Sequence, residues 1–408
     1  MQIATSNRLN SVEEYYFSTK LRDIAQRNAN GADIINLGIG SPDLPPHAKV
    51  IETLSEKATA HNTHGYQSYQ GSPILRKAIA QFYSAHFNAT INPDTEILPL
   101  IGSKEGIMHL CMTYLEAGDI VLVPNPGYPT YRAAAQLTGA TILEYVLDTT
   151  QNWDINFVQL EKNDLSRAKL MFVNYPNMPT GTPATEVLFQ KLLAFAQKHN
   201  ILIVNDNPYS FILNDKPLSI CSSPEWRKNA VELNSLSKSH NMAGWRIGWL
   251  VGDAKIITDV IRFKSNMDSG MFLPLQLAAA EALALPKTWY DSVNNVYLQR
   301  QKLVFKLLDR LNCKYNPAQQ GMFVWAEIPD NFETGFDLSN AVLDTARVFI
   351  TPGGIFGSAG EKFVRVSLCC TEEMIEKAIT RLDDFDRYFE MMKSNENLAV
   401  NKNVRGLN

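Results

Sequence analysis

Short apolar runs alternate with amphipathic segments through the middle of the chain. We interpret the runs as buried strands, at residues 98–101, 120–123, 141–145, 169–173, 201–204, 230–233 and 250–251. Between several of them, apolar residues recur at helical spacing, as at 107–115 and 187–196. Strands that alternate with helices predict an α/β fold, with a doubly wound, mostly parallel sheet that carries helices on both faces.

A second, smaller unit follows this sheet. From about Lys264 we expect a long helical stretch through 275–285 and 289–311, and then an α+β unit with strands at 322–326 and 363–368. The polar, Asn-rich end of the chain predicts a loose tail. The expected division is residues 1–45 for an N-terminal arm and part of the small domain, 46–285 for the large domain, 286–392 for the C-terminal small domain and 393–408 for a flexible tail.

Composition narrows the functional class. The 408 residues carry a net charge of −4, which does not favour a nucleic-acid or membrane partner. The N-terminus lacks the apolar core of a signal peptide, and no apolar run is long enough to cross a bilayer. The five cysteines show no C-x-x-C spacing, so we expect reduced structural thiols, no metal site and a cytoplasmic location.

Polar motifs follow the ends of two predicted strands. Asp206 comes directly after the strand at 201–204, where open α/β sheets bind ligands, although a helix cap or turn is the alternative. Gly102, Ser103 and Lys104 come between a strand and a helix. Free N–H groups at a helix start favour an anion such as phosphate, although Ser103 could be an ordinary N-cap.

The stretch 234–249 carries the most specific chemistry. Lys238 lies among serines and small or aromatic residues, where burial would lower its pKa and make its amine nucleophilic. Arg246 offers a planar fork for a phosphate, and Ser235 and Ser237 offer hydroxyls. An ordinary surface loop is the alternative reading. Together with the motifs above, the stretch predicts a site for a carbonyl-bearing phosphate ester such as pyridoxal phosphate (PLP).

The motif S-L-S-K-x7-R-x-G at 235–248 resembles that of the fold-type I PLP enzymes, the class I/II aminotransferases, and the resemblance covers about 33–385. It implies the PLP-dependent transferase fold type I, with a seven-stranded sheet, and a homodimer with shared active sites. Lys238 would be the Schiff-base lysine and proton shuttle. Asp206 would pair with the pyridine nitrogen of PLP, and Tyr209 would hydrogen-bond its phenolic oxygen O3′.

The resemblance also implies the remaining site residues. Those expected at the cofactor are Ser235, Ser237, Arg246 and the Gly102-Ser103-Lys104 turn at the phosphate, Tyr128 stacked on the ring, and Tyr66 reaching the phosphate of the other subunit. Those expected at the substrate are Gly40 and Arg365 on the α-carboxylate, with Tyr128, Tyr15 and Asn266 nearby. An arginine can bind a carboxylate through two hydrogen bonds.

One position departs from the family pattern. Met178 precedes Pro179-Thr180-Gly181 where the family usually has Asn, which donates to O3′. A thioether cannot donate, so O3′ should lose one donor and the pKa of the Schiff base should rise. Asn174 or Asn177 could compensate. The family also tends to have cis peptide bonds before Pro126 and Pro179.

The resemblance implies transfer of an amino group from an L-amino acid to a 2-oxo acid by a ping-pong mechanism. The segments LGIGSPDLPP and SNMDSGMF are similar to those of LL-diaminopimelate aminotransferases and their bacterial relatives. Aspartate, methionine, aromatic and diaminopimelate substrates all remain open at this point. A PLP-dependent C–S lyase on the same fold is an alternative, and a non-enzymatic PLP-binding regulator is a weaker one because no DNA-binding segment is visible.

Overall fold

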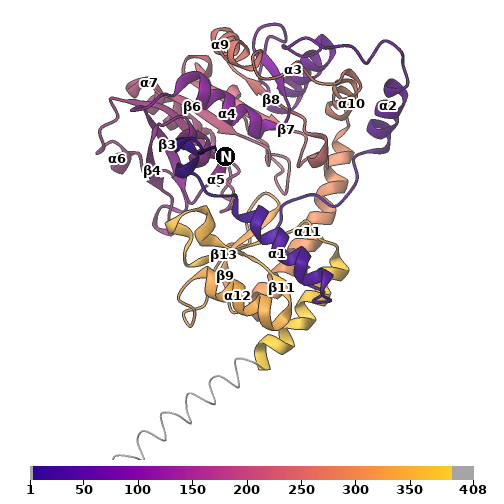
Figure 1. The fold of residues 1–408 in the computed structure, drawn as a ribbon, viewed down its shortest axis with the longest axis vertical. Coiled ribbons are helices and arrows are strands. Elements are labelled where there is room, and N and C mark those ends of the chain that lie inside the picture. The colour runs from indigo at the N-terminus through magenta and orange to yellow at the C-terminus, as the bar shows by residue number, and fades with distance from the viewer. Residues whose placement is uncertain (1–2, 388–408) are drawn as a thin grey trace, which may run out of the picture.

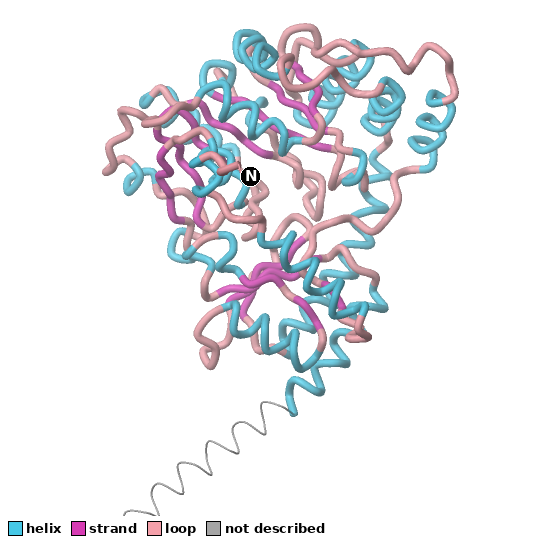
Figure 2. Tube along the Cα trace, in the orientation of Figure 1, coloured by secondary structure: helices cyan, strands magenta, loops and turns pink. Residues whose placement is uncertain are grey.

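The computed structural model describes residues 3–387, so the expected tail at 393–408 lies outside the described residues. Two domains are visible, a larger one with a twisted sheet and a smaller one below it (Figures 1 and 2). The large sheet has seven strands in the order β2-β8-β7-β6-β5-β3-β4. Their bounds are β2 Ile97–Leu100, β3 Ile120–Asn125, β4 Thr141–Val146, β5 Ala168–Val173, β6 Leu202–Asp206, β7 Ala230–Ser235 and β8 Gly248–Val251.

Only β8 runs antiparallel to its neighbours β2 and β7 in this sheet, while the other pairs are parallel. Successive residues of a strand therefore enter two different cores, as Leu122 and Val123 of β3 do. Helices α4, α5 and α9 cover one face, and α3, α7 and α10 cover the other. This arrangement confirms the predicted mostly parallel, doubly covered sheet of fold type I.

The helices of the large domain have the following bounds: α2 Ala48–Ala58, α3 Pro73–Phe87, α4 Ser103–Tyr114, α5 Pro129–Leu137, α6 Phe157–Leu160, α7 Glu186–His199, α8 Trp226–Asn229, α9 Ala254–Lys264 and α10 Leu273–Leu283. Short 3-10 turns lie at Asn7–Ser11, Thr149–Gln151, Ile220–Ser222, Ala243–Trp245, Gly353–Phe356 and Ser358–Gly360. Within the described chain no helix combines the length and apolar character needed to cross a membrane.

The small domain is built on a four-stranded antiparallel sheet in the order β12-β13-β10-β9. Its strands are β9 Lys314–Tyr315, β10 Phe323–Glu327, β12 Thr351–Pro352 and β13 Phe363–Ser367. Helix α12 (Gly335–Ala346) and a final helix, described over residues 372–387, complete this domain. Their apolar side chains share one core with the inner face of the sheet.

The N-terminal segment belongs spatially to the small domain. Strand β1 (Ile35–Asn36) pairs in parallel with β11 (Val348–Phe349), and helix α1 (Tyr16–Ala29) contributes Phe17 to the core of the small domain. The long helix α11 (Lys287–Arg310) follows α10 along the chain. Helix α11 joins the domains, because Tyr290 enters the core of the large one and Tyr297 that of the small one. These contacts support division near residues 45 and 286, which we propose as the domain boundaries.

The helical stretch expected from Lys264 is not continuous. Helix α9 ends at Lys264, residues 265–272 form a loop, and α10 and α11 are separate helices. Gly270 has a positive φ of 83°, and Pro274 and Pro286 stand at the starts of α10 and α11, so the backbone breaks where these residues require it. The Asn125–Pro126 and Met178–Pro179 bonds are cis as expected, and Tyr175–Pro176 is also cis.

Candidate active site

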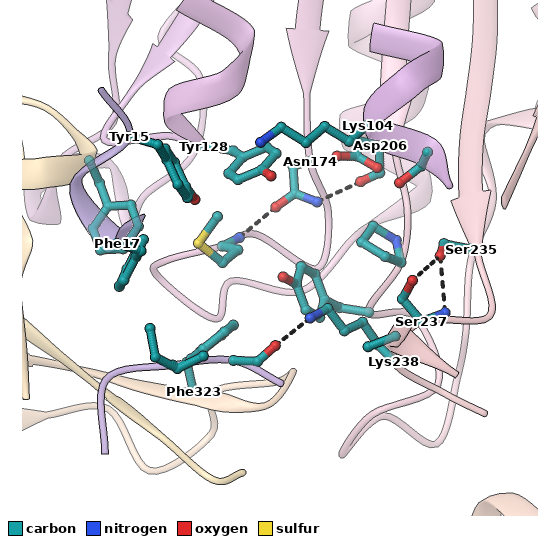
Figure 3. A pocket seen from close by; sticks show the side chains of 18 of the residues that line it. Tyr15, Phe17, Lys104, Tyr128, Asn174, Asp206, Ser235, Ser237, Lys238 and Phe323 are labelled. Carbon is teal, nitrogen blue, oxygen red and sulfur yellow. Dashed lines mark hydrogen bonds between the residues drawn. The ribbon is translucent and has the colours of Figure 1, made fainter. Parts of the chain in front are cut away.

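A cavity of about 460 Å³ lies where the two domains meet. The large domain contributes residues at the C-terminal ends of its parallel strands, and the small domain contributes Phe323, Phe356 and Arg365. Figure 3 shows Asp206, Ser235, Ser237 and Lys238 toward one side of this cavity and Tyr15 and Phe17 toward the other. The cavity is thus lined by several of the side chains that the sequence singled out.

Lys238 lies in the loop that follows β7, with its amine directed into the cavity. Its Nζ donates a hydrogen bond to the carbonyl oxygen of Gly40, which comes from the segment after β1. Burial lowers the pKa of Lys238, and the nearby cations Arg365 and Arg246 lower it further. An amine in this setting loses its proton readily and can act as a nucleophile or base.

Asp206 ends strand β6 and is 5% exposed. The hydroxyl of Tyr131 donates to Asp206 Oδ2 at 2.8 Å, whereas Oδ1 is buried and has no hydrogen-bond partner among the described residues. Burial raises the pKa of Asp206 to about 7, and the Tyr131 hydrogen bond acts in the opposite direction. A buried, unpartnered carboxylate oxygen that lines a cavity calls for a proton donor from a ligand.

A group of donors for an anion lies next to Lys238. Ser235 Oγ donates to Ser237 Oγ at 2.8 Å, and both hydroxyls line the cavity with the start of helix α4 at Ser103. Gly102 has a φ of 80°, and a Cβ there would collide with the guanidinium of Arg246. The turn therefore requires glycine both for its backbone and to let Arg246 approach the helix start.

Arg365 projects from β13 into the opposite side of the cavity. Its guanidinium lies over the rings of Phe323, Phe356 and Phe17, at 3.8, 4.7 and 5.4 Å from their centroids. It donates to Gly38 O at 2.9 Å and to Met178 Sδ at 3.2 Å, and among the described residues it has no carboxylate partner. Burial lowers the pKa of Arg365 to about 10. A buried guanidinium of this kind suits a ligand carboxylate.

Comparisons with known proteins agree with this geometry. A family model described as aminotransferase class I and II matches residues 32–382. The chain belongs to the class I and II aminotransferases. An LL-diaminopimelate aminotransferase of Dehalococcoides mccartyi is 39% identical over 384 residues, which cover 94% of this chain and 99% of the relative.

A second relative carries a different name. Transaminase BacF of Bacillus subtilis strain 168 is 37% identical over 391 residues, covering 95% of this chain and 98% of the relative. The solved apo-BacF structure superposes with a TM-score of 0.90 at 37% identity, covering 94% of this chain and all of the other. These findings confirm the identification from the Lys238 motif: the protein is an aminotransferase of this family, similar to the LL-diaminopimelate subgroup.

The residues present fit the PLP of class I and II aminotransferases. Lys238 supplies an amine of lowered pKa, and the buried Oδ1 of Asp206 lacks a donor. Ser235, Ser237 and the start of α4 supply donors for a phosphate beside Arg246. All these groups line one cavity, which is the donor set that an aldehyde, a pyridine nitrogen and a phosphate require.

Three of the predicted site residues do not line this cavity. Tyr66 is 94% exposed. Asn266 is also exposed, and its side-chain amide donates to Arg262 O at 2.9 Å. Gly102 lies against the guanidinium of Arg246. The other predicted residues line it: Tyr15, Gly40, Ser103, Lys104, Tyr128, Met178, Asp206, Tyr209, Ser235, Ser237, Lys238, Arg246 and Arg365.

Lys104 differs in direction from the expectation. Its Nζ lies 4.7 Å from the centre of the Tyr15 ring, and Figure 3 shows the amine directed toward Tyr15 and Tyr128, away from Ser235 and Ser237. Burial lowers the pKa of Lys104, and the nearby Arg246 also lowers it. The structure therefore places this cation toward the N-terminal segment, and not among the phosphate donors.

Sequence reasoning missed several cavity residues. The most important is Tyr131, which donates a hydrogen bond to Asp206. The sequence signal that could have indicated it is its position three residues after Tyr128, at the start of a helix, where the two side chains lie on the same face. Phe17 and Leu21 of α1 also line the cavity, although their spacing indicates only the apolar face of an amphipathic helix. No local pattern distinguishes a residue that packs on the core from one that lines a site.

Proposed function

We propose that this protein is a PLP-dependent aminotransferase that moves an amino group from an L-amino acid to a 2-oxo acid by a ping-pong mechanism. One observation carries the proposal: Lys238, Asp206 and Arg365 line the same cavity, where Asp206 Oδ1 has no hydrogen-bond partner and Arg365 has no carboxylate partner among the described residues. When bound, PLP supplies an aldehyde that forms a Schiff base with amines and a protonated ring that accepts electrons from Cα.

The polar side chains hold the cofactor at three points in this proposal. Asp206 keeps the proton on the pyridine nitrogen, which requires its carboxylate to be ionised. Ser235, Ser237, Arg246 and the N-terminal amides of α4 bind the phosphate. Tyr209, whose pKa is raised by burial, keeps its proton and donates it in a hydrogen bond to O3′. Tyr128, which lines the same cavity, would stack on the ring.

The reacting amino acid is held by Arg365 and deprotonated by Lys238. Arg365 binds the α-carboxylate with the backbone around Gly40, which fixes how the bonds at Cα are directed. Lys238 Nζ, close to the Gly40 carbonyl, is then placed to take the proton from Cα and return it. The same two residues act in reverse on the 2-oxo acid, so both half-reactions use one site.

Replacement of Lys238 tests the proposal. Lys238→Ala should abolish turnover and the long-wavelength absorbance of the bound cofactor, while Lys191→Ala, on the exposed side of α7, should keep both. Borohydride reduction followed by peptide mapping should place the cofactor on Lys238 in the wild type. A cofactor fixed to another lysine, or turnover by Lys238→Ala, would refute the assignment.

We further propose a homodimer with shared active sites in the cytoplasm. In one chain Tyr66 is almost fully exposed, and the large apolar side chains of Ile74 and Phe272 are also exposed. The five cysteines are unpaired, as expected in a reducing compartment. Mixing inactive Lys238→Ala with an impaired Tyr66→Ala variant should restore activity in hybrid dimers, since one site then has both residues. Activity no higher than that of the two variants measured separately would contradict shared sites.

A further inference from the structure

The two named relatives do not fix the substrate, but the cavity itself has a part that the proposed cofactor and α-carboxylate contacts leave unused. This part is lined by Tyr15, Ser18 and Leu21 of the N-terminal segment and by Ile39. We infer that it receives the amino acid's side chain, and that the preferred donors carry a large, uncharged, aromatic or long aliphatic side chain. The inference rests on the proposed aminotransferase function.

The position of this subsite follows from the residues already assigned. Asp206, Ser235 and Ser237 lie on the side of the cavity opposite Tyr15 and Phe17 (Figure 3). Phe17 packs against Arg365, whose guanidinium is enclosed by three phenyl rings. In a substrate held between Lys238 and Arg365, the side chain would therefore contact the wall formed by α1 and Ile39.

The chemistry of that wall is chiefly apolar. Leu21 is 40% exposed although it lines the cavity, and Ile39 is partly buried beside it. The ring of Tyr15 packs on Phe17 with centroids 5.5 Å apart. Covering the exposed part of Leu21 with an apolar side chain removes hydrocarbon from water, which favours binding.

Charged side chains find poor partners in this subsite. Asp206 is the one carboxylate among the described residues that line the cavity, and it is held by Tyr131 at the cofactor end. Among the described residues of one chain, a second ammonium, as in diaminopimelate, therefore has no counter-charge here. A second carboxylate, as in aspartate, would meet only Lys104, whose amine already lies over the Tyr15 ring and has a pKa lowered by burial.

The half-reaction without an acceptor tests the inference directly. The purified holoenzyme is mixed with one donor at a time, and the spectral change of the cofactor is followed by stopped flow. L-Phenylalanine and L-leucine should react with second-order constants about 10- to 200-fold above that of L-alanine, which is too short to reach the subsite. They should also exceed those of L-aspartate and LL-diaminopimelate. The inference would be overturned if L-aspartate or LL-diaminopimelate gave the highest second-order constant of the donors tested.

Leu21→Ala tests the named wall. It should lower the constants for L-phenylalanine and L-leucine by about tenfold and leave that for L-alanine unchanged. Leu298→Ala is the matched control, since Leu298 is 41% exposed on α11 and does not line the cavity. An equal loss for all three donors would overturn the subsite. If no donor changes the cofactor spectrum, the aminotransferase function itself fails, an outcome distinct from a wrong donor preference.

Discussion

The hydroxyl of Tyr131 donates to Asp206 Oδ2 at 2.8 Å, and the buried Oδ1 of this cavity-lining residue has no partner among the described residues. One oxygen of the carboxylate is thus held by the protein while the other remains for the cofactor. Tyr131 is itself held in place, because its ring stacks on Phe172 with centroids 4.9 Å and planes 5° apart. We therefore propose that Tyr131 acts through Asp206, as a positioning residue.

Tyr131→Phe should keep the stacked ring and remove only the donor. Without it the pKa of Asp206 rises further, so the acid side of the activity–pH profile should move to higher pH by about one unit. The control is Tyr145→Phe, which removes a buried hydroxyl that donates to Phe172 O at 2.6 Å. Both variants should lose about 1 kcal/mol of stability. Profiles that move equally in both variants would contradict the positioning role.

Asp206 should also make the stability of the cofactor-free protein depend on pH. Burial raises the pKa of Asp206 to about 7 in the folded protein, whereas the unfolded chain releases this proton near pH 4. The contribution of Asp206 to stability is therefore present at low pH and is lost as pH rises toward 7 and above. Asp206→Asn should be more stable than wild type at pH 8, by up to about 4 kcal/mol, although it binds the cofactor weakly. Denaturant unfolding from pH 5 to 8 checks this, and parallel curves for the two proteins would contradict it.

Met178→Asn should lower the pKa of the Lys238 Schiff base by about one unit, because an amide can donate to O3′ and a thioether cannot. The neighbouring asparagines already make other hydrogen bonds. Asn174 Nδ2 donates to Asp206 O at 2.5 Å and its Oδ1 accepts from Met178 N, while Asn177 bonds to Asn174 O and Thr180. Titration of the cofactor absorbance measures the midpoint. The control variant Met178→Leu should titrate like wild type. Equal midpoints for Met178→Asn and wild type would contradict the predicted effect of Met178 on the Schiff-base pKa.

Arg365→Lys should raise KM for L-amino acids about 10- to 100-fold with a smaller effect on kcat, because an ammonium cannot replace the two-pronged contact with a carboxylate. An amine that lacks the α-carboxylate should react equally with both proteins. Arg347→Lys, at an exposed arginine after α12, serves as the control. A KM unchanged in Arg365→Lys would exclude this arginine from carboxylate binding.

The meeting of Asp206 and Lys238 could be predicted from the sequence for a physical reason. Each follows a buried apolar run, and parallel neighbours β6 and β7 end at the same edge of the sheet, with Asp206 paired to Leu233. The motif at 235–248 then identified the chemistry. Local sequence sets the position of each residue at the end of its strand, and the parallel pairing of the two strands brings these ends together.

Contacts between distant elements could not be predicted in this way. Met178 and Arg365 meet across the domain boundary, and the direction of Lys104 depends on where the N-terminal segment lies. The contact of Tyr131 with Asp206 depends on how α5 is rotated over the sheet. Each of these requires the relative placement of whole elements, which hydrophobic periodicity does not contain.

The parallel pairing of β1 with β11 has a consequence for synthesis on the ribosome. Ile35 and Asn36 are translated early, yet their partners Val348 and Phe349 emerge only after nearly the whole chain. Strand β1, which precedes the segment that contains Gly40, therefore remains unpaired while the central sheet forms. A nascent protein that stops short of residue 348 would contain the sheet that bears Lys238. It would lack β11, so β1 would have no partner strand to hold it in place opposite that sheet.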